Sequence, residues 1–327
     1  MRGSGGARQE SSVDAWSVVA WNLNEARSHR TKTWTILGGM RADIALLTEA
    51  RVPRERLEGY VRGGESTLGL DPKARSWASA VVSPHELTDP ADDVRTRGYL
   101  RAPLANARPG SWTAVVVPVP QVGKVTAVAL YGLLDERSDA SVHRSLSDLT
   151  PLLEDRRYNK LLVLGGDLNT WTGWPAGTHQ LARDESVLRR IEAFGLVDCL
   201  VMVLKRDGRG PLAGCPCSYG DACRHTRTRI DRNRPEIPYQ MDYLYASPAL
   251  TERLLTCEAL DLGPNSPSDH FPIPRIRSAR STAQIAPPSP IVVRSSSSCS
   301  SIGRAVVSSW IAPVPRSTTM GPLPANA

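Results

Sequence analysis

The sequence lacks any long uninterrupted apolar stretch. No run approaches the roughly 18 consecutive apolar residues that a membrane-spanning helix needs, so we expect no membrane span. The N-terminal segment MRGSGGARQE is polar and lacks the apolar stretch of a signal peptide. These absences together predict a cytoplasmic protein.

Cysteines are few and are not distributed in pairs along the chain. Three of the six lie close together, at Cys215, Cys217 and Cys223, and another, Cys299, lies near the C-terminal end. A small disulfide-stabilised domain usually carries cysteines in evenly distributed pairs. The pattern therefore argues against a disulfide framework.

Acidic residues are absent from residues 278–327, a segment rich in Ser, Pro and Ala. Its short apolar groups follow no sustained period, so we expect a low-complexity, disordered tail. Residues 1–12 are polar and glycine-rich, and we expect them to be disordered as well. No internal repeat is visible between these ends, and the sequence predicts one domain at residues 13–277.

The net charge of the predicted domain is small. The whole chain has 40 Lys and Arg residues against 33 Asp and Glu residues, a formal charge of +7. Four of the arginines lie in residues 278–327, which leaves 36 basic and 33 acidic side chains in the rest of the chain. This mild excess permits a nucleic-acid substrate but does not require one.

Short segments rich in Val and aromatic residues alternate with helical patterns. The apolar or alternating segments predict strands at residues 16–22, 43–48, 77–82, 112–117, 125–131, 161–164 and 239–245. Helices are predicted at 141–153, which has one apolar face, and at 184–194, with Asp184 as the N-terminal cap. Strands with intervening helices indicate an α/β fold in which two sheets pack face to face and helices lie outside.

Polar side chains stand at or just beyond the ends of several of these strands, namely Asn22, Asn24, Glu49, Asp167 and Asn169. The last predicted strand carries Asp242, and Asp269 and His270 follow it after a loop. Strand ends and their loops are where a rigid scaffold commonly carries its chemistry. Carboxylate and amide oxygens are the ligands that Mg²⁺ and Mn²⁺ prefer. A titratable imidazole beside acids suits acid–base work or the stabilisation of charge on a phosphate.

Five ordered motifs contain these residues: WNLN at 21–24, LLTEA at 46–50, GGDLN at 165–169, MDYLYAS at 241–247 and SDH at 268–270. Together they resemble the motif set of the endonuclease/exonuclease/phosphatase superfamily, which includes DNase-I-like nucleases, exonuclease-III-like repair enzymes and several phosphatases. The resemblance covers residues 16–273. It implies a four-layer α/β sandwich, in which two packed mixed β-sheets are flanked by helices and the active site lies at one rim.

The resemblance implies a divalent metal site in this domain. Glu49 corresponds to the principal metal ligand, and Asn22 and Asp269 correspond to positions at or near the metal. The implied ion is Mg²⁺, with Mn²⁺ as an alternative.

The resemblance also implies five catalytic residues: Asp167, Asn169, His270, Asp242 and Tyr131. Asp167 corresponds to the residue that aligns or deprotonates the attacking water, and Asn169 to one that holds a phosphate oxygen. His270 corresponds to a ligand of the scissile phosphate whose imidazole Asp242 orients. Tyr131 falls where the family has a side chain near the phosphate. Each residue alone also fits an ordinary turn, capping or packing role, but the ordered set favours catalysis.

The cysteine cluster allows two interpretations. With His225, the residues Cys215, Cys217 and Cys223 supply three thiols and an imidazole within eleven residues, which is a possible zinc ligand set. Their spacing is not that of a standard zinc finger, and this favours a loop with reduced cysteines over a structural zinc site. An arginine-rich segment follows, at residues 224–234.

The function that the sequence favours is metal-dependent hydrolysis of a phosphodiester in nucleic acid by in-line attack of water. A phosphatase or phosphodiesterase acting on a small metabolite or a lipid headgroup is the alternative, because one fold can serve both activities. A non-catalytic binding module is disfavoured by the complete set of polar residues. The sequence indicates no protein partner, and it leaves open the oligomeric state and the choice between endo and exo cleavage.

Overall fold

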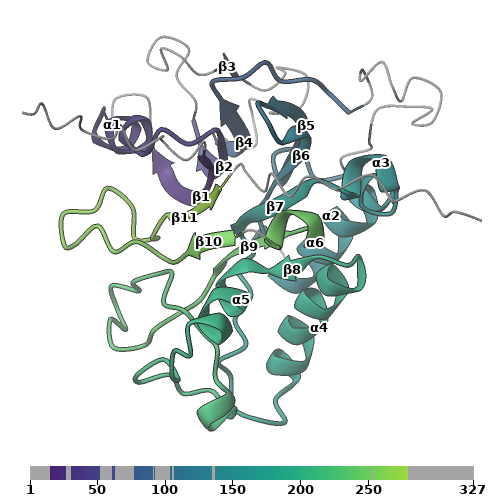
Figure 1. Cartoon of the computed structure of the whole chain (residues 1–327). Helices are drawn as coiled ribbons and strands as arrows, with labels where there is room; N and C mark the ends of the chain where they lie inside the picture. The colour runs from purple at the N-terminus through teal and green to yellow at the C-terminus, as the bar shows by residue number, and fades with distance from the viewer. Residues whose placement is uncertain are drawn as a thin grey trace, which may run out of the picture. The chain divides into compact units, whose positions relative to one another are not determined.

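In the computed structural model, the short Val-rich strands expected from the sequence pair into two separate sheets (Figure 1). The residues that the structure describes are 15–26, 31–51, 61–62, 77–90, 92, 104, 107–134, 137–252 and 254–278. The predicted disordered N-terminus lies outside these residues. So does the predicted C-terminal tail, apart from residue 278.

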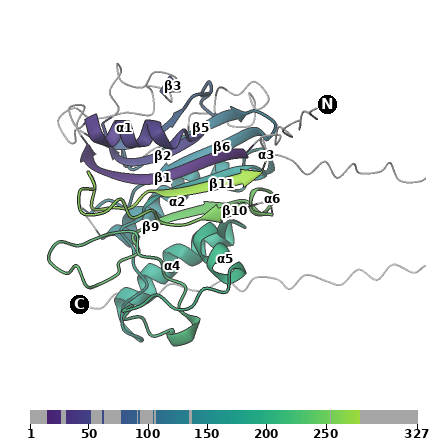
Figure 2. The ribbon, with the colours of Figure 1, turned by 60° about the vertical axis from the view of Figure 1, so that its left-hand side comes forward.

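The first sheet has six strands in the order β10-β11-β1-β2-β4-β3. Strand β1 is parallel to β2 and antiparallel to β11, and Figure 2 shows it between them. The sheet is therefore mixed. Its strands, in chain order, are β1 (Ala15–Ala26), β2 (Ile44–Ala50), β3 (Val61–Arg62), β4 (Ala78–Ser83), β10 (Leu254–Cys257) and β11 (Ile273–Ser278).

The second sheet has five strands in the order β5-β6-β7-β9-β8. Strands β6 and β7 are parallel, whereas the other neighbours are antiparallel, so this sheet is also mixed. Its strands are β5 (Trp112–Val119), β6 (Gly123–Leu130), β7 (Leu162–Asp167), β8 (Val197–Asp198) and β9 (Asp242–Ala246).

The inner faces of the two sheets form the central core. Val18 and Ile44 of the first sheet and Val115 and Ala127 of the second belong to the same buried cluster. These β-branched and small side chains alternate along their strands, so one set faces the opposing sheet. This packing holds the strand ends of both sheets in fixed relative positions.

Two consecutive glycines let β7 fit into this core. A Cβ atom added at Gly165 would lie 3.0 Å from the Tyr243 carbonyl oxygen and 3.2 Å from the Ala20 side chain of the opposing sheet. A Cβ atom at Gly166, where φ is 139°, would overlap the Leu130 carbonyl oxygen. Only glycine tolerates such close approach, so the pair fixes the path of β7 into Asp167.

Helices cover the two outer faces. Trp34 and Leu37 of α1 belong to the cluster on the outer face of the first sheet, and α2 and α4 pack against the outer face of the second. The result is the four-layer α/β sandwich predicted from the sequence. None of the helices in the described ranges is long and apolar enough to cross a membrane. The helices are α1 (Thr31–Met40), α2 (Ser138–Leu153), α3 (Arg156–Asn159), α4 (His179–Ala193), α5 (Cys199–Arg206) and α6 (Pro248–Thr251).

The prediction of an N-terminal cap at Asp184 is wrong. Helix α4 begins five residues earlier, and the Thr178 side chain caps it by accepting a hydrogen bond from the Leu181 amide. Asp184 lies inside the helix, where its carboxylate accepts hydrogen bonds from the Trp171 amide and the Trp174 indole. A tertiary role therefore accounts for a residue that looks like a local cap in the sequence.

Candidate functional site

The first two predicted residues lie on neighbouring parallel strands. Asn22 of β1 is paired in register with Thr48 of β2, which brings its amide beside the Glu49 side chain. The Asn22 Nδ2 atom donates to Glu49 Oε1 at 3.1 Å and to Asp167 Oδ2 at 2.7 Å. Asn22 is completely buried, so this amide connects a carboxylate of the first sheet to a carboxylate of the second.

Asp167 and Asp242 end up side by side because β7 and β9 are antiparallel and the two residues are partners in the register. Both are buried. Asp167 Oδ1 accepts a hydrogen bond from the Asn169 amide at 2.8 Å, and the Asn169 side chain donates to the Gly132 carbonyl at 2.9 Å. The turn after β7 thus fixes Oδ1 of Asp167, while the Asn22 amide of β1 holds Oδ2.

The imidazole of His270 lies between these two acids. Its Nδ1 atom is 2.7 Å from Asp242 Oδ2, and its Nε2 atom is 3.8 Å from Asp167 Oδ2. Burial by itself lowers the pKa of His270, but the carboxylates of Asp242 and Asp167 outweigh it and raise the pKa above the ordinary value. Burial is the main cause that raises the pKa of Asp167. The site therefore favours a protonated imidazole.

Ser268 anchors the segment that carries His270. Its hydroxyl donates to the Asn22 carbonyl at 2.8 Å and accepts a hydrogen bond from the His270 amide at 3.1 Å. Through this residue the loop after β10 is attached to β1 at Asn22, four residues before the strand ends. In the sequence Ser268 is visible only as part of the SDH motif, and no local pattern indicates such a long-range hydroxyl contact.

Tyr131 comes directly after β6, and its hydroxyl donates to Glu49 Oε1 at 2.8 Å. Its ring contacts Trp77 edge to face, with the ring centroids 5.0 Å apart. Burial, followed by the charges of Asp167 and Glu49, raises the pKa of the phenol, which therefore stays neutral and acts as a donor. Tyr131 therefore contacts Glu49, another of the site residues predicted from the sequence.

The Asp269 side chain contacts an arginine, whereas its neighbour His270 contacts the carboxylate of Asp242. Its carboxylate pairs with the Arg229 guanidinium at 3.3 Å. Burial by itself lowers the pKa of Arg229, but Asp269 and Asp167 raise it above the usual value. The described contacts of Asp269 include none with Glu49 or Asn22, so its role near a metal stays a prediction.

Thr228 is a positioning residue that sequence reasoning missed. Its buried hydroxyl oxygen accepts hydrogen bonds from the amides of Met241 and Asp242, at 2.9 and 3.0 Å. Its carbonyl accepts from the Phe271 amide at 2.7 Å. Thr228 therefore fixes the start of β9 and the segment after His270 at the same time.

Two members of this group have an uncommon backbone conformation. Glu49 and Asn169 both have φ of 48°, in the left-handed region that non-glycine residues rarely adopt. Such strain concentrates at functional sites, where the surrounding structure holds it in place. We call the whole group the strand-end cluster: Asn22, Glu49, Tyr131, Asp167, Asn169, Asp242 and His270.

Residues 19–270 match the sequence profile of the endonuclease/exonuclease/phosphatase family. The chain belongs to this family. No curated protein matches the chain. Because the matched range contains every residue of the strand-end cluster, the chain is a phosphoester hydrolase of this family, as the motifs indicated.

Solved structures of the family share the fold. An AP endonuclease from Leishmania major superposes with a TM-score of 0.54 at 14% sequence identity, over 81% of this chain and 88% of that one. The endonuclease domain of TRAS1, a telomere-specific non-LTR retrotransposon, gives 0.51 at 15% identity, over 80% and 98%. A 3′ phosphatase from Neisseria, bound to a product DNA hairpin, gives 0.50 at 16% identity, over 80% and 98%. Identities this low show a shared fold alone.

The strand-end cluster fits the divalent metal that the family typically uses. The carboxylates of Glu49 and Asp167 approach the same Asn22 amide, and their charges raise the pKa of Tyr131. Such a concentration of negative charge and of hard oxygen atoms suits Mg²⁺ or Mn²⁺. The Asn22 oxygen accepts from the Asn24 amide at 2.8 Å, so Asn22 serves here as a bridge between acids, and its role as a ligand stays a prediction.

Asp167, Asp242 and His270 also lie close enough together to form a metal-ligand set, with ligand atoms within 4.8 Å of one another. The 2.7 Å hydrogen bond between His270 Nδ1 and Asp242 Oδ2 already uses one ligand atom of each of these two residues. The assignment of the metal to Glu49 stays a prediction.

Proposed function

We propose that this protein hydrolyses phosphodiester bonds in nucleic acid with the help of Mg²⁺ or Mn²⁺. The proposal rests on one observation above all: Arg229 pairs through its backbone with His270. The basic segment 224–234 is thereby continuous with the strand-end cluster. A phosphodiester chain that reaches His270 also meets this segment.

The cluster contains the groups needed for in-line attack by water. Asp167 has a raised pKa and is held by two donors, so it accepts a proton from water and directs the oxygen toward phosphorus. The 3.8 Å between His270 Nε2 and Asp167 Oδ2 is too long for a hydrogen bond. The imidazolium N–H is therefore directed to a phosphate oxygen, where it stabilises the developing charge.

Glu49 would hold the metal, with Tyr131 and Asn22 fixing one of its oxygens. A bound Mg²⁺ or Mn²⁺ would supply charge neutralisation at the phosphoryl oxygens. Asp242 keeps the His270 ring oriented through its hydrogen bond to Nδ1. Asn169, held in its turn by hydrogen bonds to Gly132 and Asp167, would contact a phosphate oxygen of the substrate.

Exposed arginines in the basic segment supply contacts to flanking phosphates. Arg232 and Arg234 are exposed and follow Arg229 by only a few residues. Exposed cations bind phosphates without reading sequence, and each such contact makes affinity dependent on salt. This fits a polymeric substrate better than a small one.

The experiment compares the activity on different substrates and the effect of removing two positive charges from the basic segment. With Mg²⁺ present, we expect cleavage of plasmid and single-stranded DNA, and kcat/KM for DNA that falls at least ~10-fold in an Arg232→Ala/Arg234→Ala variant at low salt. The log–log salt dependence should become shallower by roughly one to two units. A matched control, Arg156→Ala/Lys160→Ala, removes two exposed charges at α3 and should change neither quantity.

A phosphomonoesterase is the second candidate, because a structural neighbour is a 3′ phosphatase bound to DNA and the charge of the domain is small. It predicts turnover of terminal or free phosphomonoesters with no internal cleavage of plasmid. In that case the arginine variant would lose activity only on DNA ends. Absence of turnover on either class of substrate would contradict both candidates.

A further inference from the structure

The segment between α5 and β9, residues 207–241, is long for a loop inside a compact domain. All of it is described, and its one helical element is a single 3₁₀ turn, η1 (Gly220–Ala222). Its buried apolar side chains are those of Cys223, Pro238 and Tyr239. The free energy gained by burying so few apolar side chains does not offset the conformational entropy lost in ordering this length of chain. Another interaction must therefore hold the loop.

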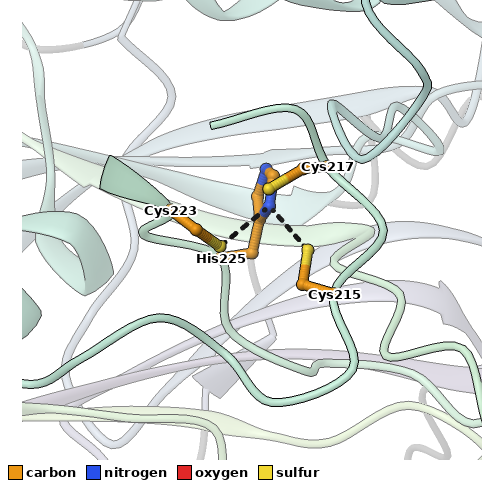
Figure 3. Close-up of side chains that lie close together, drawn as sticks. All are labelled: Cys215, Cys217, Cys223 and His225. Atoms are coloured by element: carbon orange, nitrogen blue, oxygen red, sulfur yellow. Dashed lines mark hydrogen bonds between the residues drawn. The ribbon is translucent and has the colours of Figure 1, made fainter. Parts of the chain in front are cut away.

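Four side chains of this loop converge on one point (Figure 3). They form the thiol cluster: Cys215, Cys217, Cys223 and His225, whose sulfur and nitrogen atoms all lie within 4.8 Å of one another. The Nδ1 atom of His225 is 3.2 Å from the Cys215 sulfur and 3.6 Å from the Cys223 sulfur. Tetrahedral bonds of about 2.3 Å to sulfur and 2.0 Å to nitrogen give a sulfur–nitrogen separation of roughly 3.5 Å. The two sulfur–nitrogen distances to His225 Nδ1 lie close to this value, and the other ligand atoms lie within 4.8 Å of one another.

The orientation of His225 selects Nδ1 as the ligand atom. Its other nitrogen, Nε2, lies 2.7 Å from the hydroxyl of the buried Thr172. When Nε2–H donates to that oxygen, the lone pair of Nδ1 points to the sulfur atoms, the arrangement that fixes the tautomer of a metal-bound histidine. A single lone pair accepts one thiol proton well, so hydrogen bonding does not explain two close sulfur atoms.

The pKa of Cys215 and that of Cys217 lie above the ordinary value, and among these three thiols only Cys223 has a lowered pKa. Burial raises the pKa of each thiol, but backbone amides oppose it. At Cys223, hydrogen bonds from the amides of His225 and Leu212 help to lower the pKa below its ordinary value. None of the described cysteines forms a disulfide. Three soft sulfur ligands and one imidazole select zinc over the hard cations that suit Glu49.

We propose that Cys215, Cys217, Cys223 and His225 bind one structural zinc ion. All four tetrahedral positions are filled by protein atoms, so the site is closed and has no position for water or substrate. The unusual spacing argued against zinc in the sequence, but the turn at η1 brings Cys223 and His225 back to the Cys215–Cys217 pair.

The zinc ion connects two segments that flank the strand-end cluster. Thr172 follows Asn169 in the loop after β7, and His225 precedes Thr228, which holds the amide of Asp242. Arg229, next in the chain, pairs with His270. The metal therefore positions the Asp242–His270 pair and the basic segment without contacting substrate.

The decisive measurement is elemental analysis of the full-length chain, purified without a polyhistidine tag or added metal. We expect about one zinc per chain. Cys217→Ser should weaken zinc binding at least ~10²-fold, whereas Cys217→His, which restores a ligand, should retain zinc. Cys257→Ala is the matched control, because Cys257 lies in the central core, and it should keep the metal.

Two measurements on the unmodified chain guard against a variant that fails to fold. A thiol-modifying mercurial should release zinc in step with modification of the cluster. Cobalt substitution should give thiolate charge-transfer absorption and the bands of a tetrahedral ion. Less than ~0.1 zinc per chain with freely titratable thiols, or a disulfide within the cluster, would overturn the proposal. Retention of zinc by Cys217→Ser and Cys223→Ser would do the same.

Discussion

The strand-end cluster collects polar side chains from distant points of the chain, whereas the thiol cluster comes from eleven consecutive residues, and different forces assemble the two. Asp167 and Asp242 meet because the register of β7 and β9 pairs them, and the glycines of β7 fix that register. The thiol cluster lies on the 207–241 loop, which has no such scaffold. A sheet can position hard oxygen ligands before any ion binds, whereas the loop depends on the bond that its own ligands form. Substitution within the strand-end cluster should therefore leave the zinc in place, whereas loss of zinc should loosen the loop and disturb the Asp242–His270 pair that the loop positions.

The largest expected effect is a loss of activity that distinguishes the metal at Glu49 from the zinc ion of the thiol cluster. Glu49→Gln should lower kcat/KM at least ~10³-fold, because several kcal/mol of charge stabilisation is lost with the metal carboxylate. The zinc content should stay unchanged, since no thiol-cluster residue contacts Glu49. Steady-state kinetics and elemental analysis of the same preparation test both parts.

The exposed Glu252 provides the control for this prediction. Glu252→Gln removes the same charge and should leave kcat/KM unaltered. Activity of the native protein should also vanish in excess EDTA and return on addition of Mg²⁺. Full activity in EDTA would contradict the assignment of Glu49 to a metal.

The next effect concerns the transition state. His270→Ala and Asp167→Asn should each lower kcat by at least ~10²-fold, because each removes stabilisation of charge or activation of water. KM should change less, since many contacts to the substrate remain. Single-turnover kinetics with saturating DNA measures the chemical step directly.

The exposed His179, at the start of α4, supplies a matched histidine control. His179→Ala should turn over at the native rate and keep its zinc. If His270→Ala also turned over at the native rate, the imidazole would have only a structural role beside Asp242.

A smaller effect is expected at the junction between the two clusters. Thr228→Val keeps the shape of the side chain but leaves the buried amides of Met241 and Asp242 without their acceptor. The free energy of unfolding should fall by about 2 kcal/mol, the typical range for buried donors left unpaired. We expect kcat to fall about 10-fold as Asp242 shifts, a moderate change on the scale of general acid–base effects. Urea denaturation and kinetics test these two expectations separately.

Thr256→Val on β10 is the control, because Thr256 is exposed. It should leave stability within ~0.5 kcal/mol of the native value. A Thr228→Val variant with native stability but reduced kcat would make the hydroxyl a direct participant in the site. Equal loss in both variants would remove Thr228 from the positioning role.

The sequence predicted the fold better than it predicted the residues that position the site. Val-rich strands and ordered motifs sufficed for the four-layer sandwich, because period and β-propensity are local properties. Strand β11 was missed because Pro274 and its arginines hide the pattern in a strand that pairs with β1. The strand expected to begin at residue 239 begins at Asp242, because Tyr239 instead bridges to Arg229.

Contacts between distant residues account for what was missed. The side-chain roles of Thr228, Ser268 and Thr172 are hydrogen bonds to residues far away along the chain or to loops that only the fold brings near. No local pattern encodes them. The convergence of the thiol cluster likewise depends on the path of the loop rather than on a recognisable spacing. The cytoplasmic location and the roles of single catalytic residues stay predictions.

The smallest effect is expected from removing residues 282–327. Strand β11, which pairs with β1, ends at Ser278, so this truncation keeps every strand of the first sheet. The removed segment has no acidic residue and no sustained apolar period, and it carries Cys299. If the thiol cluster is a closed four-ligand site, Cys299 contributes nothing to it. The truncated protein should therefore keep about one zinc per chain, a Tm within ~1 °C of the full chain, and native kcat/KM.

Loss of zinc on truncation would show that a tail residue completes the site and would break the separation between the two clusters. Loss of activity with zinc retained would instead assign the tail to the substrate.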